Sequence, residues 1–162
     1  MELPHTAGCL VCGRQNPHGL RLSLHVDEAS GVVSVEFTPR AEHIGFEGIV
    51  HGGVLATVLD EAMVWAATWA GKRFCVAGEM TVRFRRSAAV AEALRVEAKV
   101  ESNRARLIQT TGLVTNAAGE LVAEATGKYV PVPPERNRHV IGTLVDEPAT
   151  ARAALALKEA AQ

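Results

Sequence analysis

One long apolar segment, with few interruptions, occupies the middle of this 162-residue chain. It begins with Ile49–Met63, IVHGGVLATVLDEAM, and its helical spacing continues to about residue 70. On a helical wheel centred on Leu55, the apolar positions form one broad face: Val58, Leu59, Ala62, Ala66 and Trp69. The segment predicts a helix over residues 52–70, ended by Gly71-Lys72. Because it is apolar around most of its circumference, the rest of the chain must surround it.

The sequence on both sides of this helix alternates between apolar and polar residues, which is the period of a half-buried strand. Two strands are predicted before the helix, at 20–26 and 33–37, joined by a turn at 27–31. Four are predicted after it: about 80–85, 94–101, 106–115 and 120–131. An antiparallel sheet with one helix buries that helix by wrapping around it. We therefore expect an α+β domain of about five to six strands around a central helix.

The composition shifts near both ends of the chain suggest three parts. Residues 1–19 are rich in glycine and lack a periodic pattern, so we expect an irregular N-terminal segment. Residues 20–134 form the predicted domain, closed by prolines at its end. Residues 135–162 are expected to be a linker followed by an Ala/Leu-rich helix.

Charge and composition argue against several classes of partner. The formal net charge is −1 and aromatic residues make up only 4%, whereas nucleic-acid binders usually carry a basic excess or stacking aromatics. No apolar run reaches the roughly 18–20 residues of a membrane span. The first residues, MELPHTAGC, lack the basic and apolar parts of a signal peptide. We expect a cytoplasmic protein with neither a nucleic-acid nor a membrane partner.

The cysteines Cys9, Cys12 and Cys75 are too few, and odd in number, for a disulfide framework. Cys9-x-x-Cys12 is compatible with zinc binding, with redox chemistry or with a structural turn. A closed zinc site needs four ligands, and a second CxxC is absent from the sequence, although His5 and His18 are nearby. We interpret the motif as a turn and predict no metal and no cofactor.

The start of the central helix has the features of an anion site. The first N–H groups of a helix lack intrahelical partners, and paired glycines such as Gly52-Gly53 allow a ligand to approach the backbone. This suits a carbonyl oxygen that becomes an oxyanion, while Asp60 could act as a base or nucleophile. The alternatives are that the glycines only cap the helix, that Asp60 pairs with an arginine, and that Glu61 lies on a solvated edge.

Three segments together resemble the hotdog-fold acyl-CoA thioesterases of the 4-hydroxybenzoyl-CoA/phenylacetate-degradation branch. They are Glu42–Met63 (EHIGFEGIVHGGVLATVLDEAM), Cys9–Leu20 with its CLVCG and NPHGL motifs, and Glu79–Phe84 (EMTVRF). The resemblance covers about residues 8–131. It implies a long helix wrapped by an antiparallel sheet, the same arrangement that the periodicity predicts.

The resemblance also implies roles for individual residues. The Gly52 N–H would polarise the thioester carbonyl, His51 would shape the carbonyl pocket with Gly53 beside it, and Asp60 would be the catalytic carboxylate. Glu61 would be structural. Two positions depart from the family pattern: Gly45 replaces an asparagine found in some relatives, and Ala77 replaces a serine or threonine that holds the attacking water. A non-catalytic acyl-CoA or small-acid binding protein of the same fold therefore remains the main alternative, ahead of a dehydratase or a zinc-dependent protein.

Coenzyme A carries phosphates, which bind arginine and lysine side chains. Arg83, Arg85 and Arg86 end the strand after the helix and are the preferred candidates, with Arg83 and Arg85 on the sheet face opposite the helix. Ordinary solvated surface is the alternative for each of them. An apolar acyl pocket is suggested by Val54, Met63, Val64 and Ala67.

Helix geometry predicts an oligomer. Gly52 and Asp60 are eight residues apart, which is roughly 12 Å along a helix axis, too far for both to act on one carbonyl. A dimer with antiparallel neighbouring helices would supply one residue from each chain, as the resemblance also implies. We expect a homodimer with shared active sites, or a homotetramer built as a dimer of dimers.

Overall fold

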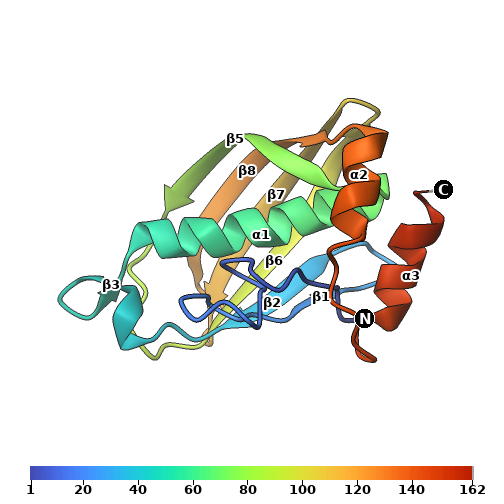
Figure 1. Ribbon diagram of the computed structural model, residues 1–162. Coiled ribbons are helices and arrows are strands. Elements are labelled where there is room, and N and C mark those ends of the chain that lie inside the picture. The colour runs from blue at the N-terminus through green and yellow to red at the C-terminus, as the bar shows by residue number, and fades with distance from the viewer. Residues whose placement is uncertain (162) are drawn as a thin grey trace.

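The computed structural model describes residues 1–161 and shows a six-stranded antiparallel sheet curved around one long helix (Figure 1). The strand order is β1-β2-β6-β7-β8-β5. The strands are β1 (Leu24–Val26), β2 (Val33–Phe37), β5 (Cys75–Phe84), β6 (Leu94–Arg104), β7 (Leu107–Asn116) and β8 (Leu121–Pro131). The predicted α+β class and its number of strands are confirmed.

The central helix α1 (Gly52–Gly71) lies across the concave face of the sheet, and its predicted apolar face is buried there. The packing is close: a Cβ built on Gly112 of β7 would lie 2.9 Å from both Leu59 Cδ2 and Met63 Sδ. The helix does not end on a left-handed glycine, since Lys72 adopts that conformation with φ 51°. No helix within residues 1–161 is long and apolar enough to cross a membrane.

The first strand is shorter than predicted. Strand β1 covers Leu24–Val26, whereas alternation predicted residues 20–26. The Leu20 and Leu22 N–H groups donate to the Leu10 and Val11 carbonyls, 2.8 and 2.9 Å away. Because the N-terminal segment takes these hydrogen bonds, the alternating residues pair with that segment instead of with β2.

The connection from β2 to α1, for which the sequence predicts neither a strand nor a helix, contains short elements. A 3-10 turn covers Ala41–His43, and a small hairpin pairs β3 (Ile44–Phe46) with β4 (Ile49–Val50). The predicted helical tail is present as α3 (Ala151–Glu159), but the expected linker before it holds a further helix, α2 (Pro134–Ile141). Asn137 of α2 accepts a hydrogen bond from the Phe74 N–H at 2.8 Å, which ties this helix to the start of β5.

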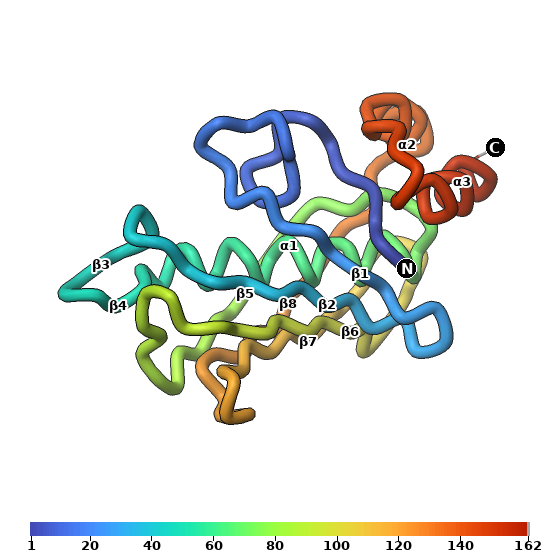
Figure 2. Tube along the Cα trace, turned by 90° about the horizontal axis from the view of Figure 1, so that it is seen from below, coloured from blue at the N-terminus to red at the C-terminus, as the bar shows by residue number. Residues whose placement is uncertain are grey.

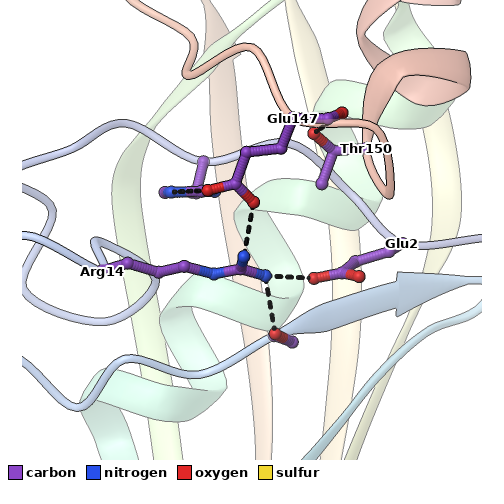
Figure 3. Close-up of polar contacts among 6 residues, drawn as sticks. Glu2, Arg14, Glu147 and Thr150 are labelled. Carbon is purple, nitrogen blue, oxygen red and sulfur yellow. Dashed lines mark hydrogen bonds and ion pairs between the residues drawn. The ribbon is translucent and has the colours of Figure 1, made fainter.

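Both chain ends pack onto the domain. The N-terminal segment lies on the side of α1 away from the sheet (Figure 2). The Arg14 guanidinium of that segment donates a hydrogen bond to the Glu2 carboxylate at 2.7 Å and forms an ion pair with Glu147, which follows α2 (Figure 3). The Leu3 N–H and the Met1 carbonyl bond to β1, so residues 1–3 cover one edge of the sheet. The other edge, β5, has no strand beside it within residues 1–161.

Candidate active site

The start of α1 presents one backbone N–H that has no acceptor within residues 1–161. His51 is the N-cap residue, and its Nδ1 accepts a hydrogen bond from the Gly53 N–H at 2.9 Å. The Val54 N–H donates to the His51 carbonyl. This leaves the Gly52 N–H available at the positive end of the helix dipole, where a carbonyl oxygen would be stabilised.

The preceding loop fixes the position of His51. Its N–H donates to the His43 carbonyl at 2.9 Å, and a Cβ built on Gly45 would lie 2.9 Å from His51 Cα. A side chain at Gly45 would therefore displace His51, so this departure from the family pattern has a packing reason. His43 Nδ1 accepts the Arg40 N–H at 3.0 Å, and burial lowers the pKa of His43.

A cavity of about 450 Å³ opens beside the Gly52 end of the helix, and Phe84, Arg85 and Arg86 are among its lining residues. Arg85 Nε lies 3.0 Å from Glu124, and Arg86 forms an ion pair with Glu120 at 3.1 Å. The structure thus brings these two predicted phosphate-binding residues to the helix start.

Arg83 lies apart from that cavity. It pairs in register with Glu124 and lines a separate depression together with residues of β7 and β8. Its neighbours in β5, Met80 and Val82, pack against the core, so Arg83 points to the outer face of the sheet, as alternation predicts. Arg83 therefore does not line the cavity at the helix start that Arg85 and Arg86 line.

Asp60 lies half-buried in the middle of α1 and makes one side-chain hydrogen bond. The Tyr129 hydroxyl of β8 donates to Asp60 Oδ1 at 2.8 Å. Tyr129 is 0% exposed, and burial together with the neighbouring Asp60 raises the pKa of its hydroxyl. No arginine pairs with Asp60 within residues 1–161. The ion-pair alternative is thus not supported, and Oδ2 is left without a protein donor in this part of the chain.

Ala77 is the register partner of Tyr129 across the β5–β8 ladder. Paired residues of an antiparallel ladder direct their side chains to the same face. Ala77 therefore belongs to the face that carries the Tyr129–Asp60 contact, but it brings no hydroxyl. Its side chain is exposed at the uncovered β5 edge.

Glu61 lies on a different side of α1 from Asp60, because adjacent helical residues are rotated by about 100°. Its carboxylate accepts a hydrogen bond from Trp65 Nε1 at 3.1 Å and lies 3.7 and 3.8 Å from Cys9 Sγ. Burial raises the pKa of Glu61 to about 7. A hydrogen bond with Cys12 lowers the pKa of Cys9 to about 5, whereas the same bond raises the pKa of Cys12. The solvated-edge alternative for Glu61 is wrong.

The four residues suggested for an acyl pocket do not meet in one cavity. Met63 and Ala67 are buried against the sheet. Val54 lines a cavity with the N-terminal segment, and Val64 lines another one beside Cys9. Their apolar side chains suggested one pocket, whereas the N-terminal segment and the sheet cover different parts of the helix.

Two residues that sequence reasoning missed contribute to the site. Tyr129 is the only tyrosine of the chain, and it occupies an inward position in the β8 alternation pattern. A phenol at such a position needs a buried partner, which is a signal that could have linked it to Asp60. His43 left no comparable signal, because its role depends on the irregular loop before α1.

Comparison with known proteins finds a family match in the middle of the chain. Residues 47–123 match the family model of the thioesterase superfamily, a segment that contains the helix start, Asp60 and strand β5. No curated protein matches the chain by sequence.

Solved structures share the fold. A thioesterase superfamily protein matches 76% of this chain with 27% identity and a TM-score of 0.71, although the chain spans only 60% of that protein's length. PaaI of the E. coli phenylacetic acid degradation operon matches 70% of the chain and 81% of its own length, with 24% identity and a TM-score of 0.65. A Streptococcus mutans protein bound to acetyl-CoA covers 68% of the chain and 88% of its own length, with 19% identity and a TM-score of 0.64. At these identities the last two show the fold alone. The family model of the thioesterase superfamily thus matches the central segment of the chain, residues 47–123, and the chain shares the hotdog fold of solved thioesterases; these matches confirm the resemblance drawn from the sequence.

Proposed function

We propose that this protein hydrolyses acyl-CoA thioesters, with Asp60 as the catalytic carboxylate and the Gly52 N–H as the oxyanion donor. The observation that carries this proposal is the state of Asp60. A half-buried carboxylate in a largely apolar helix is costly unless it is paired or functional. Asp60 is held through one oxygen by Tyr129, while no protein donor within residues 1–161 occupies the other. That free oxygen is available to a water molecule or to a substrate carbon.

The reaction requires an attacking oxygen and a stabilised carbonyl. The thioester carbonyl oxygen would accept the Gly52 N–H and gain negative charge as the carbonyl carbon becomes tetrahedral. Asp60 would either take a proton from the attacking water or attack the carbon itself, with water hydrolysing the resulting anhydride. In both routes the C–S bond breaks, and the products are a carboxylic acid and the free coenzyme A thiol.

The coenzyme A part of the substrate would bind at the cavity beside the helix start. Arg85 and Arg86 line that cavity, and each pairs with a glutamate that a phosphate group could replace as partner. The Streptococcus mutans relative binds acetyl-CoA on the same fold, which supports this class of ligand.

The active site would be shared between two copies of the chain. Gly52 and Asp60 are separated by roughly 12 Å along α1, whereas a reacting carbon must be within about 3.5 Å of its nucleophile. The edge strand β5 supports a dimer, because it is ten residues long, uncovered, and exposes the apolar side chains of Val76 and Phe84. An isologous two-fold contact would produce two composite sites, each with Asp60 from one chain and Gly52 from the other.

The same fold without a water-holding hydroxyl at Ala77 would also suit an acyl-CoA binder that does no chemistry. A panel of acyl-CoAs assayed with a thiol reagent separates the two functions, because free thiol rises only if the thioester is hydrolysed. Asp60→Asn keeps the shape of the side chain and should lower the rate at least about 10²-fold. Glu61→Gln is the matched control and should lower the rate of thioester hydrolysis far less. Binding without thiol release by the wild type, or full activity in Asp60→Asn, would contradict the proposal.

A further inference from the structure

Three potential metal ligands from two distant segments meet beneath the N-terminal segment. Cys9 Sγ, Cys12 Sγ and a carboxylate oxygen of Glu61 all lie within 4.8 Å of one another. The sequence favoured a turn over a metal site, because CxxC supplies only two of the four ligands of a closed zinc site; His5 and His18 were the nearby candidates for the others. The structure places His5 beside Glu147 and His18 in a different cavity, while α1 supplies Glu61 as a third ligand.

The spacing of these groups fits a tetrahedral zinc ion. Zinc binds thiolate sulfur at about 2.3 Å and carboxylate oxygen at about 2.0 Å, so two such ligands should be roughly 3.5 Å apart. The Glu61 oxygens lie 3.7 and 3.8 Å from Cys9 Sγ. These distances are long for a strong hydrogen bond to sulfur, but they are within a few tenths of an ångström of the separation expected between two ligands of one zinc ion.

The local structure holds the ligands in this arrangement. The Val11 N–H donates to Cys9 Sγ at 3.4 Å and the Gly13 N–H donates to the Cys9 carbonyl at 3.1 Å, so the chain turns tightly through the motif. A Cβ at Gly13 would lie 2.4 Å from the Cys9 carbonyl oxygen, which requires glycine in this turn. On the helix, the Trp65 indole N–H orients the Glu61 carboxylate, as outer partners of metal ligands commonly do.

The surroundings leave room for a fourth ligand. A cavity of about 200 Å³ adjoins the cluster and is lined by Thr6, Val64, Phe74 and Cys75 as well as by the three ligands. Two thiolates and a carboxylate in such a place would carry three negative charges, which is unfavourable without a cation. A divalent ion would offset most of that charge, and a water molecule in the cavity would complete four-coordination.

We propose that Cys9, Cys12 and Glu61 form a zinc site that fastens the N-terminal segment to α1. The site is separate from the proposed thioesterase chemistry, since Glu61 and Asp60 face different sides of the helix and the Tyr129 hydroxyl of the sheet donates to Asp60. This proposal is independent of the proposed thioesterase activity, because it concerns only metal content and the anchoring of residues 8–13.

The first test measures metal content. Full-length protein without a histidine tag, kept reduced, is incubated with Zn²⁺, dialysed and analysed for zinc per chain. We expect about one zinc per chain in the wild type. Cys9→Ser and Glu61→Gln should weaken zinc binding at least about tenfold, whereas the control Glu97→Gln, at an exposed carboxylate of β6 outside this cavity, should retain it. Reduced wild type that takes up no zinc, or equal loss in Glu97→Gln, would overturn the proposal.

The second test needs no variant and therefore does not depend on how the substitutions fold. Wild-type protein loaded with Co²⁺ should show an intense near-ultraviolet sulfur-to-cobalt charge-transfer band, and zinc should protect Cys9 from alkylation by iodoacetamide. Cobalt bound without the thiolate band, or alkylation of Cys9 at the same rate with and without zinc, would show that the ion lies elsewhere.

Discussion

The hydroxyl of Tyr129 offers the most specific test of how Asp60 is held. Tyr129→Phe removes one oxygen and leaves the ring, which packs closely enough that a Cβ at Gly127 would lie 2.6 Å from it. The substitution therefore deletes the 2.8 Å hydrogen bond to Asp60 with little change in core volume. Tyr129 does not contact the substrate in this account. It is a positioning residue that acts through the carboxylate.

The expected magnitude follows from the charge of the acceptor. A hydrogen bond to a charged group contributes about 1.5–3 kcal/mol, and each 1.36 kcal/mol corresponds to tenfold in rate or equilibrium. If all of the energy of this hydrogen bond serves to orient Asp60 in the transition state, its loss should lower kcat about 10- to 100-fold. KM should change little, because the acyl-CoA contacts are unaffected. The free energy of unfolding should fall by about 1–3 kcal/mol, since Asp60 is left without its partner.

The assay is steady-state release of free thiol from the best acyl-CoA substrate, together with urea unfolding of both proteins. The Asp60→Asn and Asp60→Asn/Tyr129→Phe variants complete a double-mutant cycle. The second substitution should add little once Asp60 is gone. A Tyr129→Phe enzyme with wild-type kcat, or losses that simply multiply in the double variant, would refute the idea that Tyr129 acts through Asp60.

Three further outcomes are expected. Neutralising Arg85 and Arg86 together should raise KM for acyl-CoA much more than for a truncated thioester without the nucleotide; equal effects on both substrates would remove them from the coenzyme A site. Burial lowers the pKa of His43 in the folded state, so the unfolded chain takes up a proton first. The neutral His43 therefore stabilises the fold above the unfolded pKa of about 6.5, and this contribution should be lost as the pH falls below that value. Urea unfolding at pH 7 and 5 should show a smaller loss of stability in His43→Gln than in the wild type. An equal loss in both proteins would show that His43 is not responsible. Gly112→Ala should destabilise the fold by about 1–3 kcal/mol by overpacking Met63, whereas Gly8→Ala, with open space around it, should change urea unfolding little; similar effects would disprove the packing argument.

Periodicity was sufficient for most of the fold. The apolar positions around Leu55 predicted the buried face of α1, and alternation predicted β6, β7, β8 and the second half of β5, because burial against one partner imposes one period. The first half of β5 was missed, since residues 76–79 are all exposed and do not alternate. It failed at Leu20 and Leu22, which alternate like a strand but bond to the N-terminal segment. A pattern in one segment indicates that a face is buried and does not indicate which other segment covers it.

The candidate site was predictable where the chemistry is local to the sequence. His51 and the Gly52 N–H belong to one helix start, so short spacing was enough to place them together, although the His51 cap on the Gly53 N–H was not predicted. The partners of Asp60 and Glu61 were not predictable in this way. Tyr129 reaches Asp60 from 69 residues away, and Cys9 reaches Glu61 from 52 residues away. Such contacts depend on sheet order and on the docking of the N-terminal segment.

Subunit mixing tests the central claim, a shared thioesterase site, most directly. Asp60→Asn removes the carboxylate, and Gly52→Pro removes the N–H at the first helical position, where proline is tolerated. Each variant alone should be inactive. When the two are dissociated and reassembled in equal amounts, half of the dimers should be mixed and each mixed dimer should hold one intact site, so about a quarter of wild-type activity should return. Well-folded mixed dimers without any recovery, or an active species that proves monomeric, would contradict the account.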